Sequence, residues 1–201
     1  MLTVFQEPRY NRRSLTVTTP PAVRAVHFEE MKNFLRIEED FSDDDALLSE
    51  LVVLAEQAVE VYCKRALITQ TIKLTMDYFP ARNDLTLPRC PIQSITSITT
   101  YDQNNDASVL DSTVYSLDTA GGRLYLNQDG VWPTDLRPRA AVEILYVAGY
   151  GSSAGYVPDG LRLAIKTYAS ALYDSRGLCE MPSDTIMLLN GYRLYDDLGA
   201  L

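Results

Sequence analysis

Histidine and cysteine are scarce in this chain of 201 residues, and their scarcity excludes several kinds of site. The only histidine is His27, and the three cysteines, Cys63, Cys90 and Cys179, lie far apart with no Cys-x-x-Cys pair. Zinc sites and disulfide frameworks need Cys or His residues clustered at short spacing. The sequence therefore predicts no metal, no disulfide and no other cofactor, and we expect three reduced thiols.

Basic residues are outnumbered as well. Lys and Arg total 18 against 27 Asp and Glu, which gives a net charge of −9. Proteins hold nucleic acid mainly through cations that face phosphates, so an acidic chain is a poor candidate for this role. An acidic surface would instead repel DNA and let it slide past. The strongest basic cluster, Arg9, Arg12 and Arg13, keeps a small nucleic-acid-binding module open as the alternative.

Long apolar runs are missing too. The longest helix-like run, Leu51 to Ala55, is too short to cross a bilayer, and residues 1–13 lack the apolar centre of a signal peptide. We therefore expect a soluble protein that is made in the cytoplasm and has no membrane contact. Hydrophobic residues at 46% and charged residues at 22% are typical of one ordinary globular domain.

Motifs that carry chemistry are also absent. No Gly-x-Ser-x-Gly occurs, and no motif gives His27 a nucleophile or an acidic partner, so we predict no enzyme. The run from Gly149 to Gly155 matches neither glycine-rich nucleotide motif. It could bind an anion before a helix, but we interpret it as a flexible strand–helix connection. Asp43 to Asp45 lack the calcium-loop pattern, and we interpret them as a helix N-cap.

Apolar periodicity predicts three helices. A short helix follows His27, with Phe28, Met31 and Leu35 on one face. A long helix covers about 44–65, and a third covers about 158–176. The stripe expected to face the core in the long helix is Leu47, Leu51, Leu54, Ala55, Ala58 and Tyr62; in the third helix it is Leu161, Ala164, Ile165, Tyr168, Leu172 and Tyr173.

Between the long helix and the third helix the period changes to that of strands. Alternating or β-rich segments cover 68–78, 92–101, 113–117, 123–127 and 141–147, with turn residues such as Gly121-Gly122 between them. The fold class is therefore α+β: a long helix and a C-terminal helix packed with an antiparallel β-sheet. Residues 1–26, with three prolines, are expected to form an extended arm. A core domain covers 27–180, and an apolar partner-docking tail, detached from the core, covers 181–201.

Several segments, in their order and spacing, resemble one known family. Each segment is weak alone, and together they span about residues 30–195. They are Phe34–Ile37, Ala55-Glu56, Val59–Tyr62, Arg65–Thr71, Leu87–Ile92, Val147–Gly151, Val157-Pro158, Asp174–Gly177 and Leu188–Arg193. In this pattern the chain resembles the head–tail connector adaptors of tailed phages and of phage-like gene transfer agents.

The resemblance implies a non-enzymatic structural protein in the neck of a virion or phage-like particle. Twelve copies would form a ring under the portal protein, extend the DNA channel, and join the capsid to the stopper and tail. DNA would pass through the lumen without specific binding. The alternative is a small nucleic-acid-binding or other assembly module of such a particle.

The same resemblance, with the aromatic and apolar content of the termini, indicates two sets of contact residues. The tail residues expected to bind the portal are Leu188, Leu189, Tyr192, Arg193, Leu194 and Tyr195. The residues expected to form contacts within the ring are Leu15, Val17, Tyr62 and Tyr101.

Overall fold

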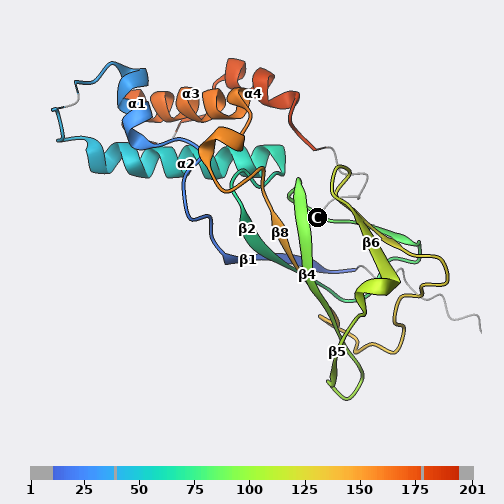
Figure 1. The fold of residues 1–201 in the computed structure, drawn as a ribbon. Coiled ribbons are helices and arrows are strands. Elements are labelled where there is room, and N and C mark those ends of the chain that lie inside the picture. The colour runs from blue at the N-terminus through green and yellow to red at the C-terminus, as the bar shows by residue number, and fades with distance from the viewer. Residues whose placement is uncertain (1–10, 39, 178, 195–201) are drawn as a thin grey trace, which may run out of the picture.

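A computed structural model describes residues 11–38, 40–177 and 179–194, with the helices at one end and the strands at the other (Figure 1). The helices in this part of the chain are α1 (Phe28–Leu35), α2 (Asp45–Cys63), α3 (Asp159–Ser175) and α4 (Ser183–Asn190), with 3-10 turns η1 (Ser112–Val114) and η2 (Ala154–Tyr156). The three helices predicted from periodicity are confirmed. The sequence did not predict α4.

The strands form two antiparallel sheets, so the predicted α+β class is confirmed. The five-stranded sheet has the order β1-β2-β8-β4-β5, and the three-stranded sheet has the order β3-β7-β6. Their bounds are β1 Arg13–Thr19, β2 Gln70–Met76, β3 Asp84–Thr86, β4 Ile92–Tyr101, β5 Ala107–Val109, β6 Tyr115–Asp118, β7 Arg123–Leu126 and β8 Val142–Ala148.

One hydrophobic core lies on one face of the five-stranded sheet. Buried residues alternate with half-buried ones along β2 and β8, as the period of a strand requires. Ile72 and Leu74 of β2 belong to the same buried cluster as Leu85 of β3 and Leu124 of β7. The small sheet therefore closes over this face.

A second core lies among the helices. Leu48, Val52 and Val59 of α2 are buried in one cluster with Leu161 and Ile165 of α3. The predicted stripe of α3 is buried from Leu161 to Leu172. The stripe predicted for α2 is wrong at Leu47 and Leu54, which are 43% and 38% exposed, whereas Ala55 is buried and Leu51, Ala58 and Tyr62 pack partly buried against the core. Apolar residues cover more than one face of α2, so periodicity alone fits two orientations of the helix.

The acidic run before α2 serves contacts other than the predicted cap. Asp44 is the N-cap residue, but its side chain bonds no backbone N–H of the helix. Its carboxylate accepts the hydroxyl proton of Tyr173 instead. Asp45 pairs with Lys32 at 2.9 Å. These bonds connect the start of α2 to α3 and α1.

The run from Gly149 to Gly151 joins the two cores. The amide of Gly149 donates to the carbonyl of Pro91 (2.9 Å), that of Tyr150 to Leu67 (3.0 Å), and that of Thr69 to Gly151 (3.0 Å). The sequence predicted that this connection is flexible, and that prediction is wrong for Gly149 to Gly151, whose backbone groups are hydrogen-bonded. Gly149 has φ +128, and a Cβ there would lie 2.5 Å from the carbonyl carbon of Ile68.

Replacing Gly149 by alanine is expected to lower the free energy of unfolding by roughly 2–4 kcal/mol, from backbone strain and overpacking together. Denaturant unfolding measures this loss. Gly155→Ala is the matched control in the same loop, because a Cβ at Gly155 meets nothing within 4 Å. Equal stability of the two variants would contradict this account of the junction.

Candidate assembly surfaces

The C-terminal segment, expected to be a detached tail, packs on the helical core from Ser183 onward. Leu189 is fully buried and Thr185 is 2% exposed, while Leu188 is partly buried against the same cluster. The expectation of a tail separate from the core is thus wrong for residues 183–194. Tyr195 lies outside the described residues.

The four described residues after α4, 191–194, are held against the end of α2. The amide of Leu194 donates to the carbonyl of Cys63 at 3.0 Å. Nε of Arg65 donates to the carbonyl of Tyr192 at 2.5 Å. Both bonds are made by backbone groups of this segment. They therefore hold it against α2 independently of what its side chains contact.

Tyr62, predicted as a ring contact, is engaged by the same segment. Its hydroxyl donates to Oδ1 of Asn190 at 2.7 Å, and the guanidinium of Arg193 lies 5.0 Å from the centroid of its ring. Beside it, burial raises the pKa of the Cys63 thiol to about 11, which keeps the thiol protonated and unreactive. The structure thus brings Tyr62 and Arg193 together within one chain.

Strand β1 is an open edge of the five-stranded sheet. Leu15 pairs with Leu74 and Val17 with Ile72, so these side chains continue the apolar rows of the buried face. Beyond β2, however, nothing in the described part of the chain covers them fully, and they are 36% and 50% exposed. The sheet therefore ends in an apolar edge strand with no charged residue between Ser14 and Thr19.

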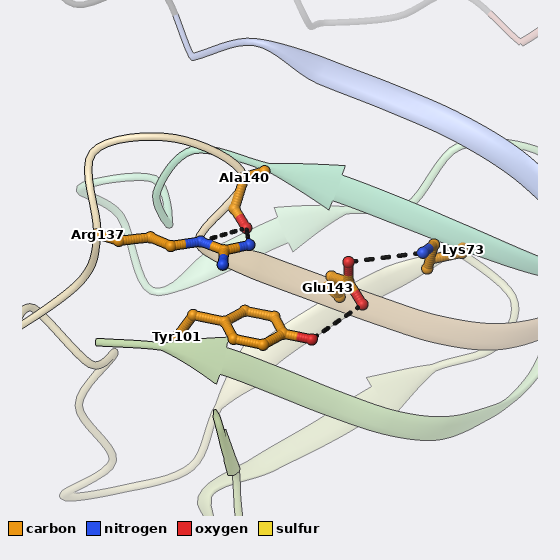
Figure 2. A network of polar contacts seen from close by, with 5 residues as sticks. All are labelled: Lys73, Tyr101, Arg137, Ala140 and Glu143. Atoms are coloured by element: carbon orange, nitrogen blue, oxygen red, sulfur yellow. Dashed lines mark hydrogen bonds and ion pairs between the residues drawn. The ribbon is translucent and has the colours of Figure 1, made fainter. Parts of the chain in front are cut away.

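The opposite face of the sheet carries a polar network (Figure 2). Oε1 of Glu143 lies 3.5 Å from Nζ of Lys73, and Oε2 accepts from the hydroxyl of Tyr101 at 3.5 Å. The guanidinium of Arg137 lies 4.1 Å from the centroid of the Tyr101 ring and donates to the carbonyl of Ala140. Tyr101, the last predicted ring contact, thus lies half-buried in a set of intrachain contacts.

The outer face of α2 is a second apolar surface. Leu47, Leu54 and Val61 follow each other at intervals of seven residues, so they form one row along the helix. Val61 is the most exposed of the three, at 64%. Sequence reasoning assigned Leu47 and Leu54 to the core and left Val61 out. The available signal was that leucine and valine occupy two helical faces rather than one.

Two carboxylates are enclosed on α2. Oε2 of Glu56 accepts the amide proton of Ala25 at 3.2 Å, and Oε1 of Glu60 accepts those of Leu67 (2.8 Å) and the Gln70 side chain (2.9 Å). Burial raises the pKa of both, and that of Glu56 reaches about 7. These groups attach the N-terminal segment and the start of the sheet to α2.

Because the pKa of Glu56 is raised, the free energy of unfolding is expected to fall as pH rises. The folded state binds the proton of the Glu56 carboxyl more tightly than the unfolded state does. The stabilisation from this proton is therefore complete below about pH 4.5 and is lost as pH rises through 7. We expect Glu56→Gln, which keeps an acceptor for Ala25, to remove a decline of roughly 2–3 kcal/mol in the free energy of unfolding between those pH values. Urea unfolding at several pH values measures it, with exposed Glu50→Gln as the control. An unchanged pH profile would contradict the burial of this charge.

Features of an enzyme are not found in the described residues. No group of three or more His, Cys, Asp or Glu side chains there could hold a metal ion. His27 is the N-cap residue of α1, and its side chain makes no capping hydrogen bond. None of the helices at the described positions combines the length and apolarity needed to span a membrane. What remains is a set of apolar and polar surfaces.

Known proteins resemble this chain in both sequence and fold. A family model described as "Head completion protein" matches residues 26–169. A solved chain from the neck of an empty gene transfer agent particle, computed with C6 symmetry, is 25% identical, with a TM-score of 0.78 over 93% of this chain and 98% of that chain. A chain from the neck of a native particle, computed with C12 symmetry, is also 25% identical, with a TM-score of 0.75 over 93% and 98%.

A chain from the virion of a native gene transfer agent particle has the same fold, with a TM-score of 0.77 and 24% identity over 92% of this chain and 98% of that chain. No curated protein sequence matches this chain.

Proposed function

Because the chain belongs to the head completion protein family, we propose that it is a structural connector whose twelve copies form a ring under the portal of a phage-like particle. The observation that carries the proposal is the likeness to particle-neck chains over 93% of this chain at 25% identity. A neck computed with C12 symmetry is compatible with twelve copies. In this role the protein carries out no chemical reaction.

Ring closure needs a surface on each copy that meets a different surface on the next copy. The edge strand β1 suits this purpose, because Leu15 and Val17 extend a buried apolar face into solvent. Exposed, uncharged edge strands promote association unless a neighbour covers them. The row Leu47, Leu54 and Val61 on α2 offers a second contact of the same kind. Tyr62, which follows Val61 on α2, would border this second contact. Tyr101 would meet a neighbouring copy elsewhere, because β2 and β8 separate β4 from β1.

The portal would be met at the exposed side of α4 and at the residues that follow it. Of the six predicted residues, Leu189 is enclosed in the core, and Leu188, Tyr192 and Leu194 are partly buried. Arg193 is exposed and lies over Tyr62, where its guanidinium could donate to a carboxylate or carbonyl of the portal. Tyr195, outside the described residues, directly follows this position in the sequence.

The net charge supports a channel that does not hold DNA. A chain with charge −9 repeated twelve times would repel the phosphate backbone, so DNA would pass through the lumen without specific binding. The other face of the ring would present a surface to the stopper, the next protein of the neck. This surface is not assigned to residues.

Sedimentation velocity of the purified chain, alone and with portal rings, tests the proposed function. We expect either a species of about twelve copies or co-sedimentation with the portal at one chain per portal subunit, as closed cyclic symmetry requires. A chain that stays monomeric at all concentrations and never sediments with the portal would refute the proposal.

A further inference from the structure

The helical end of the molecule has two outer faces that point in opposite directions. α2 and α3 lie side by side (Figure 1), and both bury a stripe of residues in the core that they share. The buried residues include Leu48, Val52 and Val59 of α2, and Leu161 and Ile165 of α3. The side of each helix remote from its buried stripe therefore faces away from the other helix. A ring of identical copies needs two different surfaces of this kind on each copy.

The outer face of α2 is apolar and carries an acid. Leu47, Leu54 and Val61 form its exposed row, which is about 21 Å long at 1.5 Å per residue. Glu50 is exposed on the same side of the helix, between Leu47 and Leu54. A row of exposed apolar side chains of this length marks a surface that another molecule covers.

The outer face of α3 is apolar and carries a base. Leu163 is 45% exposed, and Phe34, near the end of α1, is 41% exposed. Nζ of Lys166 lies 5.7 Å from the centroid of the Phe34 ring. Leu163 and Lys166 are three residues apart in α3, so they lie on one side of the helix. The short side chains of Thr167 and Ser170 continue this side toward the end of α3.

The two helices are antiparallel, and one contact shows which of their residues are level. The hydroxyl of Tyr173, near the end of α3, donates to the carboxylate of Asp44 at the start of α2. At the other end, the carbonyl of Tyr192 accepts from Arg65, which lies just after α2. The ring of the same tyrosine lies against Gly160 in the first turn of α3. Positions along α2 and α3 can therefore be compared by counting from the Asp44–Tyr173 contact.

The features of the two outer faces lie at matching heights along the helices. Glu50 is six residues from the Asp44–Tyr173 contact and Lys166 is seven, which is about 9 Å and 10 Å along the axes. Leu54 and Leu163 are each ten residues from it, about 15 Å. Rotation about a ring axis keeps every residue at its height along that axis. In a ring whose axis runs along these helices, the acid and the base therefore come level, and so do the two leucines.

We propose that the outer face of α2 in one copy packs against the outer face of α3 and α1 in the next copy. The carboxylate of Glu50 pairs with the ammonium of Lys166 across this contact, and Leu54 packs on Leu163. Neither Glu50 nor Lys166 forms an ion pair with another residue in the described part of the chain. The inference rests on the proposed ring, and it names the surface that the exposed row of α2 meets.

Disulfide cross-linking tests this contact in the intact chain. The background is Cys179→Ser, because the other two cysteines are buried. A chain with Leu54→Cys and Leu163→Cys should oxidise, under conditions where the parent assembles alone or on the portal, to a ladder of linked chains up to the size of the ring. Each single variant alone should give no linked product, and an equal mixture of the two should give pairs. Leu54→Cys with Val131→Cys is the matched control without a ladder, since Val131 is exposed at the sheet end.

Charge reversal gives a second measurement. Glu50→Lys and Lys166→Glu should each raise the protein concentration needed for ring formation by roughly tenfold or more, because each places like charges across the contact. A chain with both reversals should assemble at a concentration within about threefold of the parent's. Asp106→Lys, in the exposed turn after β4, makes the same change in charge away from the helices and should have no effect.

Three results would overturn the proposed contact while the ring, followed by sedimentation velocity, persists. They are a ring without a cross-link between positions 54 and 163, linked pairs from Leu54→Cys alone, and a Glu50→Lys variant that assembles normally and loses only portal binding. The last result would assign the outer face of α2 to the portal. Absence of a ring from the parent chain, both alone and on the portal, would instead refute the proposed function together with this contact.

Discussion

Leu189→Asp is expected to unfold the helical end of the protein. Leu189 has no exposed surface and lies among α2, α3 and α4 in the helical core. Removing a buried leucine costs about 2–5 kcal/mol, and an unpaired carboxylate in its place adds to this loss. Since single domains are stable by about 5–15 kcal/mol, the variant should be mostly unfolded at 37 °C. Circular dichroism and thermal unfolding measure the effect.

Met187→Asp is the matched control for this substitution. It lies two residues away on the same helix but is 74% exposed, so the same charge is expected to cost less than about 0.5 kcal/mol. A third variant, Leu189→Ala, should fold with reduced stability and allow the loss to be measured. If Leu189→Asp folded like the parent and lost only portal binding, α4 would be a docking tail and not part of the core.

Charges on β1 are expected to abolish the ring while leaving each copy folded. The double substitution Leu15→Glu with Val17→Lys keeps the net charge and replaces two side chains that are 36% and 50% exposed. Surface changes of this kind usually alter stability by about 0.5 kcal/mol or less each. At an interface, however, each unpaired charge must be desolvated, so association should weaken by about 100-fold or more. Sedimentation velocity and thermal unfolding together separate these two effects.

Val131→Glu is the control for the charged β1 variant, because Val131 is 73% exposed and lies outside both proposed ring contacts. It should leave ring formation and thermal stability unchanged. A ring that assembled normally from the charged β1 variant would exclude this strand from the interface. The outer row of α2 would then be the next surface to test, through Leu54→Asp and Val61→Lys.

Local pattern was sufficient for the elements that are long and regular. β4 has the predicted bounds, Ile92–Tyr101, and α3 buries most of its predicted stripe. β3 and β5 were missed because each has three residues, too few to show alternation. Periodicity identifies a helix or strand only when the element is long enough for its pattern of apolar residues to repeat.

The two larger errors concern which surfaces pack together, not where helices and strands begin and end. Leu47 and Leu54 were placed in the core because α2 is apolar on two faces, and sequence does not say which face meets α3. Likewise, the apolar residues after Pro182 had to be buried somewhere, since an exposed cluster of this kind is unfavourable. The sequence could not distinguish burial on the chain's own helices from burial on a portal. That choice depends on the tertiary arrangement of α2 and α3.

Electron microscopy of the two purified proteins mixed together tests most directly whether the chain assembles as the proposed ring on a portal. The account predicts particles in which a ring of twelve copies caps one end of the portal and continues its channel, with β1 and α2 at the contacts between copies. Portal particles that stay bare beside separate monomers, or a ring that places both surfaces in solvent, would contradict it.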